Sequence, residues 1–364
     1  MHAADQPGSM SRSAQIGWWI FVLLACAQFT IRYVWRNAPY LDLSAYANGT
    51  GMMPFQGRVL MAWVLKATAG NPHWSGVLTH LGAHLPETLR SPYAVALLIV
   101  NFFAMVVCIL AGRSTLQHLT GDTTFSAWAS LLLLYMTYFN LVIGYGLFMI
   151  PYDILSLTIF VLSVWLVIAK RYAVLTLVVA IGTLNRETII FIPLFLVLYT
   201  WFSNRHAKEA PKASGRRWET VLPYIAVQLL IWIALRMWIE HHFRNNPLEV
   251  SMPTRWFGIR LGGNLRSLTK PPQWALLLSL FGFTLPLFIA KFDKIGDRAL
   301  AHSTAIVMAL WAVAMLLVGV VVEIRIFSEL TAFMMPCIAL IVWSEWIRPA
   351  AQFRARMQEE KSHG

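Results

Sequence analysis

Ionisable residues recur at the short interruptions between the apolar segments of this chain. The set comprises Asp42, Arg58, Tyr152, Asp153, Arg186, Glu187, Glu323, Arg325 and Glu329. A carboxylate can take a proton from a hydroxyl group, and an arginine can hold a phosphate through two parallel hydrogen bonds. Charged groups at membrane depth are expensive and tend to line a site or a pathway. We therefore expect these residues to form one functional site.

Structural roles compete with this interpretation at some of these positions. Asp153 follows Pro151 and Tyr152 at a helix start, where a carboxylate can act as a cap. Arg186 and Glu187 are adjacent and can neutralise a buried turn as an ion pair. For each of these, the structural and the functional reading are about equally supported.

The last group, Glu323 to Glu329, also admits a structural role. Glu323 and Arg325 are two positions apart, so on one helix they do not face each other, and they can pair with other helices instead. Glu329 at a helix start favours the helix dipole. Asp42 lies in an interfacial stretch and has no comparable structural reason. We expect it to be the catalytic residue, with Tyr152, Asp153, Glu187 and Glu323 in support.

The composition places these residues in a membrane protein. Of 364 residues, 58% are hydrophobic and only 13% are charged, about half the charge of an ordinary soluble domain. This excludes a soluble enzyme, a disordered protein and a disulfide scaffold. The three cysteines are widely spaced within apolar stretches, so neither disulfides nor a zinc site are expected. The net charge of +12 indicates contact with anionic lipid headgroups, and no nucleic-acid module is recognisable.

Hydrophobic segmentation predicts an all-α transmembrane bundle of about ten spans, with residues 1–364 forming a single membrane domain. The expected spans are Ile16–Trp35, Tyr93–Gly112, Phe125–Met149, Ile154–Ala169, Tyr172–Leu184, Thr188–Phe202, Trp218–Ile239, Trp274–Ala290, Leu300–Val322 and Leu330–Ile347. Between the first two, helical spacing at Arg58–Ala69 and Val77–Leu89 predicts two amphipathic helices lying on the membrane surface.

The segment around Arg186 requires a choice between one span and two. As a single helix, 171–202 would be about 48 Å long, which exceeds the roughly 30 Å apolar core of a bilayer. The loop that follows carries five basic residues and is expected to be cytoplasmic. Only two short spans satisfy that expectation when the N-terminus is inside. Residues 185–187 then form a turn below the membrane surface, which requires burial in protein or a wet cavity.

Alternation from this point orients the chain. We expect both termini in the cytoplasm. Residues 37–92 and 240–272 are expected to form long external loops, and residues 349–364 a short cytoplasmic tail. The pair His80 and His84 can supply two metal ligands from one helix face, which is too few for a site. No cofactor or metal is expected, and the sequence does not support dependence on a divalent metal.

Three short stretches resemble a known class of bacterial membrane enzymes. They are Pro54-Phe55-Gln56-Gly57-Arg58-Val59-Leu60, Asn185-Arg186-Glu187-Thr188 and Glu323-x-Arg325-x-Phe327-x-Glu329-Leu330. Their order, their shared side of the membrane and the first-loop helices are similar to GT-C glycosyltransferases, over residues 16–347. This resemblance implies transfer of a sugar from a polyprenyl-phosphate carrier to a glycan or lipid acceptor at the outer face.

The resemblance also implies roles for individual residues. The first external loop of such enzymes supplies the catalytic acid, which corresponds here to Asp42. Arg58, Arg186 and Arg325 occupy the positions that would bind the lipid phosphate. Many members carry paired acids in that loop, whereas Asp42 has no second acid before Glu87. This departure leaves the metal dependence and the identity of the base open.

Two other functions fit the same residues. In a transporter or lipid flippase, ionisable residues line a substrate or proton path. Against this reading, the acids lie at one membrane face and no inverted repeat is visible. In a non-catalytic subunit of an assembly or polymer exporter, the charged turns would be structural ion pairs only.

Overall fold

The computed structural model describes residues 10–36, 38–39, 41–143, 148–209, 218–248 and 260–350. The expected tail at 349–364 and the middle of the expected loop at 240–272 fall largely outside the described residues. Within the described residues, regular structure is helical apart from two strands of two residues each. The prediction of an all-α bundle is confirmed.

Seven helical segments in the described residues are long and apolar enough to cross a bilayer. They are α1 (Arg12–Arg36), α5 (Pro92–Thr120), α6 (Thr123–Ala129) with α7 (Leu132–Tyr138) and η3 (Phe139–Ile143), η4 (Glu187–Ile190) with α10 (Phe191–Glu209), α11 (Trp218–His242), α15 (Arg298–Val318), and η7 (Ile324–Leu330) with α16 (Thr331–Val342) and η8 (Trp343–Ile347). The protein is therefore a multi-pass membrane protein. The full number of spans and the likeness to GT-C enzymes stay predictions.

Large apolar side chains on the outer faces of the long helices are suited to a bilayer. Leu24 on α1, Leu230 on α11 and Ile289 on α14 (Leu285–Ala290) are all about two-thirds exposed, at 67%, 66% and 68%. Many large exposed apolar side chains are unusual in soluble proteins and indicate contact with lipid or a partner. The described helices thus present lipid-compatible surfaces.

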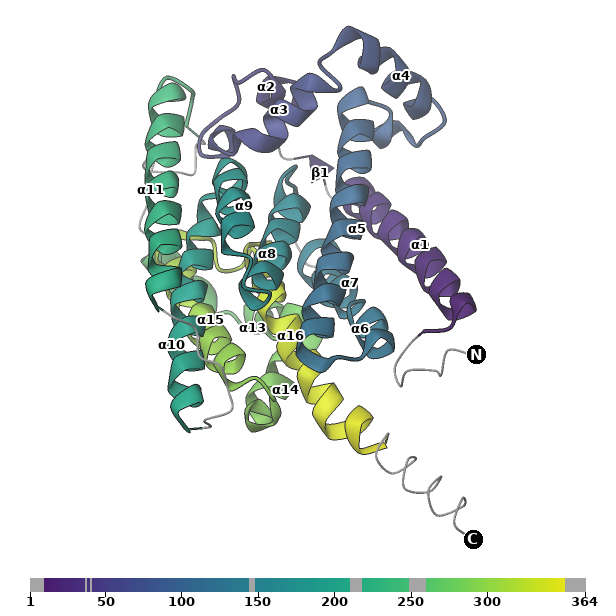
Figure 1. Cartoon of the computed structure of the whole chain (residues 1–364). Helices are drawn as coiled ribbons and strands as arrows, with labels where there is room; N and C mark the ends of the chain where they lie inside the picture. Colours follow the sequence, from purple (N-terminus) through teal and green to yellow (C-terminus); the bar gives the residue numbers. More distant parts are fainter. Residues whose placement is uncertain are drawn as a thin grey trace.

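The long loop between α1 and α5 forms a helical cap at one end of the bundle (Figure 1). Its elements are β1 (Ala38–Pro39), α2 (Leu43–Ala47), η1 (Phe55–Gly57), α3 (Val59–Ala67), α4 (Pro72–Gly82) and η2 (Glu87–Leu89). The second expected surface helix begins earlier and ends sooner than Val77–Leu89, because Asn71 caps its start through the amide of His73 and Pro72 occupies its first turn. Helices in this loop are confirmed; their contact with a membrane surface stays a prediction.

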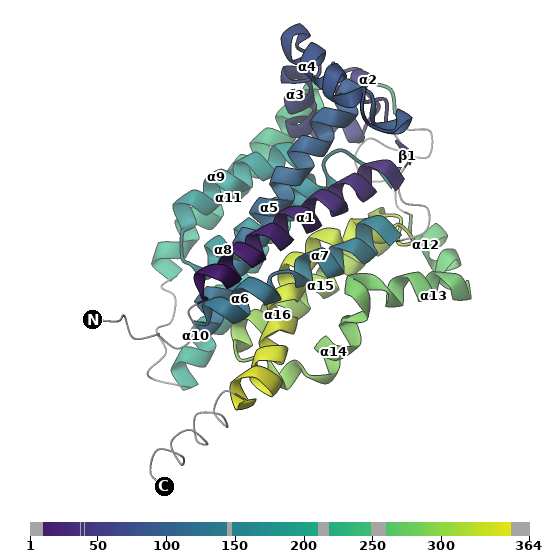
Figure 2. The ribbon, with the colours of Figure 1, turned by 90° about the vertical axis from the view of Figure 1, so that its right-hand side faces the viewer.

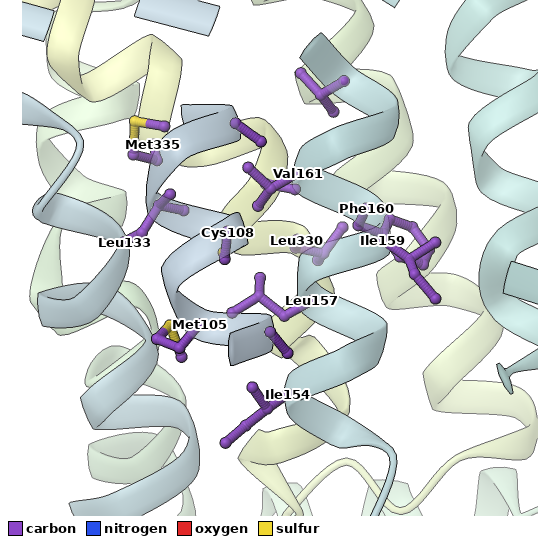
Figure 3. Packing of buried hydrophobic residues seen from close by; sticks show 14 of the residues in the cluster. Met105, Cys108, Leu133, Ile154, Leu157, Ile159, Phe160, Val161, Leu330 and Met335 are labelled. Atoms are coloured by element: carbon purple, nitrogen blue, oxygen red, sulfur yellow. The ribbon is translucent and has the colours of Figure 1, made fainter. Parts of the chain in front are cut away.

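Two short helices form the centre of the bundle beneath the cap. They are α8 (Asp153–Ile168) and α9 (Tyr172–Asn185), of 16 and 14 residues. At 1.5 Å per residue they are about 24 and 21 Å long, against about 43 Å for α5. Figure 3 shows α8 packed on α5 through Leu157, Cys108 and Met105. The expected break at residue 186 is present, because α9 ends at Asn185 and Arg186 is extended, and both residues are buried in the protein.

One expected span is not a single helix. In place of Trp274–Ala290, the structure has separate short elements along one side of the bundle (Figure 2). The elements of this region are α12 (Leu261–Leu268), α13 (Pro271–Leu278), η5 (Leu280–Phe283), α14 (Leu285–Ala290) and η6 (Phe292–Lys294). Strand β2 (Phe148–Met149) lies elsewhere in the chain, between η3 and α8, and pairs with β1. Phe281 and Gly282 have left-handed backbone angles, with φ of 56° and 63°, which a continuous helix cannot contain.

Candidate functional site

The predicted site residues lie at the ends of helices that meet beneath the cap. Arg58 lies between η1 and α3, and Tyr152 and Asp153 begin α8. Arg186 ends α9 in an extended conformation, with φ of −161° and ψ of 141°, which turns the chain into η4. Because α8 and α9 are both short, these ends reach the same depth. Local chain breaks thus bring charged side chains together.

Arg58 forms the upper part of the site. Its Nη2 donates to Glu187 Oε1 at 2.6 Å and its Nε donates to Glu187 Oε2 at 3.2 Å, so the ion pair is bidentate. Its Nη1 donates to the Tyr152 hydroxyl, and the guanidinium carbon lies 4.6 Å from the centre of the Tyr152 ring. The guanidinium is therefore fixed by a carboxylate fork and an aromatic face.

Burial raises the pKa of the Tyr152 phenol above its usual value, although Arg58 and Arg325 partly oppose this effect. The phenol is therefore protonated at neutral pH. Its oxygen accepts a hydrogen bond from Arg58, and its own O–H has no acceptor among the described residues. The phenol can consequently donate to a bound oxyanion.

Arg186 is the centre of the buried part of the site. Its Nη1 lies 2.8 Å from Glu329 Oε1 and 3.3 Å from Asp153 Oδ1. Both carboxylates have no exposed side-chain surface, and the Arg186 side chain is 5% exposed. Ser156 donates to the same Glu329 oxygen at 2.6 Å. Buried charges persist only when paired and hydrogen-bonded, and this arrangement provides both.

Arg325 links Asp153, in the buried part of the site, to Glu323, which is partly exposed. Its Nη1 lies 3.5 Å from Asp153 Oδ2, and its Nη2 donates to Glu323 Oε2 at 2.6 Å. Tyr33 on α1 also donates toward Asp153, at 3.4 Å, and to the carbonyl of Ile150 at 2.8 Å. Asp153 is therefore shared between Arg186 and Arg325.

The network becomes more exposed toward its two ends. The side chains of Glu187 and Glu323 are 31% and 28% exposed, whereas those of Asp153 and Glu329 are fully buried. With every group ionised, three arginines and four carboxylates carry a formal charge of −1. An anion can bind here only by replacing a rim carboxylate at one of the arginines.

Polar atoms without a partner in the described residues gather at this network. They are Asn185 Oδ1, Arg186 Nε, Arg325 Nε, Ser328 Oγ and Glu329 Oε2, all buried. Native proteins satisfy nearly all buried polar atoms, so a concentration of exceptions marks a place where function takes precedence over stability. Arg186 Nε and Arg325 Nε are thus buried donors whose hydrogen bonds are not satisfied within the described residues.

Asp42 lies outside this network. Its Oδ1 accepts from the backbone amides of Ser44 and Ala45 at 2.9 and 3.1 Å, so it caps α2. The residue is exposed and forms no ion pair among the described residues. The helix it caps carries Tyr46, whose hydroxyl donates to the carbonyl of Arg58. Asp42 is thus at the same end of the molecule as the arginines, and its Oδ2 has no hydrogen-bond donor among the described residues.

The structure brings together all the predicted site residues except Asp42. Glu329 is a full member of the ion-pair network and not simply a dipole partner. The structure also adds residues that sequence reasoning missed. Arg236 donates to the carbonyl of Gly57 at 3.3 Å, and an arginine inside an apolar span was a signal for it. Tyr33 and Ser156 carry no such signal, because both types are common in helices.

No group of three potential metal ligands occurs among the described residues. His80 and His84 lie beside one another with ring centres 5.8 Å apart, without a third ligand. Comparisons of the chain with protein-family models, with curated proteins and with solved structures found no match.

Proposed function

We propose that the protein is a glycosyltransferase of a bacterial inner membrane, which moves a sugar from a polyprenyl-phosphate donor to a glycan or lipid hydroxyl at the outer face. The observation that supports this proposal is the convergence of Arg58, Arg186 and Arg325 beneath one helical cap, where Arg186 Nε and Arg325 Nε have no acceptor among the described residues. Guanidinium groups stabilise a phosphate as it leaves.

Arg325 and Arg58 are the arginines that receive the donor phosphate. Arg186 is held by two fully buried carboxylates and organises the site from below. Glu323 contacts Arg325 through one short bond and is partly exposed, so it is the rim carboxylate that a phosphate replaces most readily. A protonated Tyr152 adds a neutral donor beside Arg58.

Asp42 is the base in this proposal. Its free carboxylate oxygen takes the proton of the acceptor hydroxyl as that oxygen bonds to the anomeric carbon of the donor sugar. The bond between this carbon and the phosphate oxygen breaks, and the polyprenyl phosphate leaves with the electron pair. Closing the cap over the donor would bring Asp42 to the reacting atoms, because α2 already packs on the Arg58 backbone.

The broken helix pair α13–α14 supplies the surface for the lipid chain. An apolar cavity of about 340 Å³ is lined by Leu278, Leu285, Pro286, Ile289 and Ala290. The bend at Phe281, between these two helices, packs against η3 and η7, the segment that carries Arg325. In this proposal the cavity takes part of the isoprenoid tail of a donor whose phosphate is bound at Arg325.

The proposal is tested by incubating the full chain in nanodiscs with labelled polyprenyl-phosphate sugars and with glycan and lipid acceptors. Asp42→Asn keeps a good helix cap and removes the base. We expect it to lower transfer by about 100-fold or more, as is typical for loss of a general base. Asp122→Asn is the matched control, because Asp122 also caps a helix, α6, through the Phe125 amide at 2.8 Å.

The outcomes separate the possible functions. Transfer by wild type and by Asp122→Asn, with loss in Asp42→Asn, supports the proposal. Transfer at the wild-type rate by Asp42→Asn rejects Asp42 as the base. Movement of the intact donor across the bilayer without sugar transfer identifies a flippase and rejects the enzyme.

A further inference from the structure

A polar pocket lies at the end of the bundle away from the cap. Its volume is about 660 Å³. Its walls come from the last turn of α5, the turn between α8 and α9, the middle of α10, the start of α15 and the end of α16 with η8. Elements distant in sequence thus enclose one pocket, which shares no lining residue with the site beneath the cap.

Basic side chains dominate the charge of this pocket. Lys170, Arg298 and Arg348 line it, and none of them forms an ion pair among the described residues. The one acidic residue lining it is Asp297, whose Oδ1 accepts from the Leu300 amide at 2.9 Å and whose Oδ2 accepts from the Tyr199 hydroxyl at 2.6 Å. With the histidines neutral, three cations and one carboxylate give a formal charge of +2.

Nearby basic residues outside the pocket form ion pairs. Lys291 pairs with Glu345 at 2.8 Å, and Lys294 pairs with Asp293 at 3.4 Å. The chain therefore supplies carboxylates to basic residues on this face, but not to the three that line the pocket. Unneutralised cations around a concave space form a binding site for an anion.

Apolar side chains also line the pocket. They are Leu119, Ile168, Leu340 and Trp343, and the Trp343 ring packs 5.0 Å from that of Phe125. Cations and apolar side chains in one pocket match a phosphate joined to glycerol and acyl chains better than a free inorganic anion. Basic pockets between membrane helices are known to hold anionic headgroups.

We propose that this pocket binds the phosphate of an anionic phospholipid headgroup, through Lys170, Arg298 and Arg348. The site lies at the opposite end of the molecule from the proposed catalytic site and is independent of it. Each cation contributes charge and hydrogen bonds to the phosphate oxygens, and the acyl chains lie toward Trp343. The ligand class is a diacylglycerol phosphate lipid with a net negative headgroup.

The test measures binding of short-chain phosphatidylglycerol, phosphatidylcholine and inorganic phosphate to the purified full chain in detergent, by native mass spectrometry. We expect saturable binding of phosphatidylglycerol and an increase in its Kd of about fivefold for each cation removed, which corresponds to roughly 1 kcal/mol per basic residue. The variants are Lys170→Gln, Arg298→Gln and Arg348→Gln, singly and combined. Lys294→Gln is the control from the same face.

Each result decides the proposal. Binding of phosphatidylglycerol that is weakened in the pocket variants and retained in Lys294→Gln supports it. Equal binding of phosphatidylcholine, or wild-type binding by the combined variant, overturns it. Binding of inorganic phosphate that blocks phosphatidylglycerol at equal concentration assigns the site to a soluble phosphate. Size-exclusion profiles of the single variants, which alter only exposed side chains, verify that the fold is intact.

Discussion

Asp153→Asn removes the carboxylate on which the buried network depends. Asp153 lies 3.3 Å from Arg186 and 3.5 Å from Arg325, with no exposed side-chain surface. An asparagine offers one acceptor oxygen, and its amide nitrogen then faces the other guanidinium, donor against donor. Removing one partner of a buried ion pair typically costs 3–5 kcal/mol.

Two remaining contacts reduce the expected loss. Arg186 keeps Glu329 at 2.8 Å, and Arg325 keeps Glu323 at 2.6 Å. We therefore expect the lower limit of that range, a loss of about 3 kcal/mol in the free energy of unfolding. This is roughly a 150-fold change in the unfolding equilibrium constant.

Reversible unfolding in mixed micelles of SDS measures this loss, because the 16 tryptophans report the transition by fluorescence. Glu345→Gln is the control, since Glu345 pairs with Lys291 at 2.8 Å on an accessible surface. We expect its free energy of unfolding to remain unchanged within error. A loss below about 1 kcal/mol in Asp153→Asn would refute the reasoning, because the buried charges would then not depend on one another.

Two further substitutions probe the elements that hold the site. Ser156→Ala removes the 2.6 Å hydrogen bond to buried Glu329 and should lower the free energy of unfolding by about 1.5–3 kcal/mol. Ser163→Ala on the same helix removes a hydrogen bond to the backbone carbonyl of Ile159 and should lower the free energy of unfolding by less. Equal losses in the two variants would contradict this prediction. Gly282→Ala places a Cβ within 2.9 Å of Tyr135 Cζ at a φ of +63°. The resulting strain at the bend between α13 and α14 should lower the free energy of unfolding by about 1–3 kcal/mol. A wild-type free energy of unfolding would show that the bend is not constrained.

Sequence patterns predict the site better than they predict its chemistry. The short spans around residue 186 followed from length and loop charge alone, and the break is present where expected. Charges at helix ends indicated which residues meet, because burying them requires mutual neutralisation. The pairings themselves, such as Asp153 shared by two arginines, depend on helix packing that no local pattern encodes.

Failures of prediction have physical causes as well. The composition of 274–290 is apolar enough for a span, but the left-handed backbone angles at Phe281 and Gly282 interrupt the helix. These angles depend on tertiary contacts, because Gly282 packs against Tyr135 and the backbone amide of Phe281 donates a hydrogen bond to Asn140. Asp42 had no visible structural role in the sequence, yet it caps a five-residue helix. A cap and a base are compatible, because capping uses one of its two oxygens.

Equilibrium binding of polyprenyl phosphate tests the central claim most directly, since it requires neither the sugar nor the acceptor. We expect wild type and Lys170→Gln to bind polyprenyl phosphate but not neutral polyprenol, and Arg58→Gln and Arg325→Gln each to raise the Kd by about tenfold, a charge-assisted contact of about 1.4 kcal/mol. Equal affinity for polyprenol and its phosphate, or wild-type affinity in both arginine variants, would contradict the account.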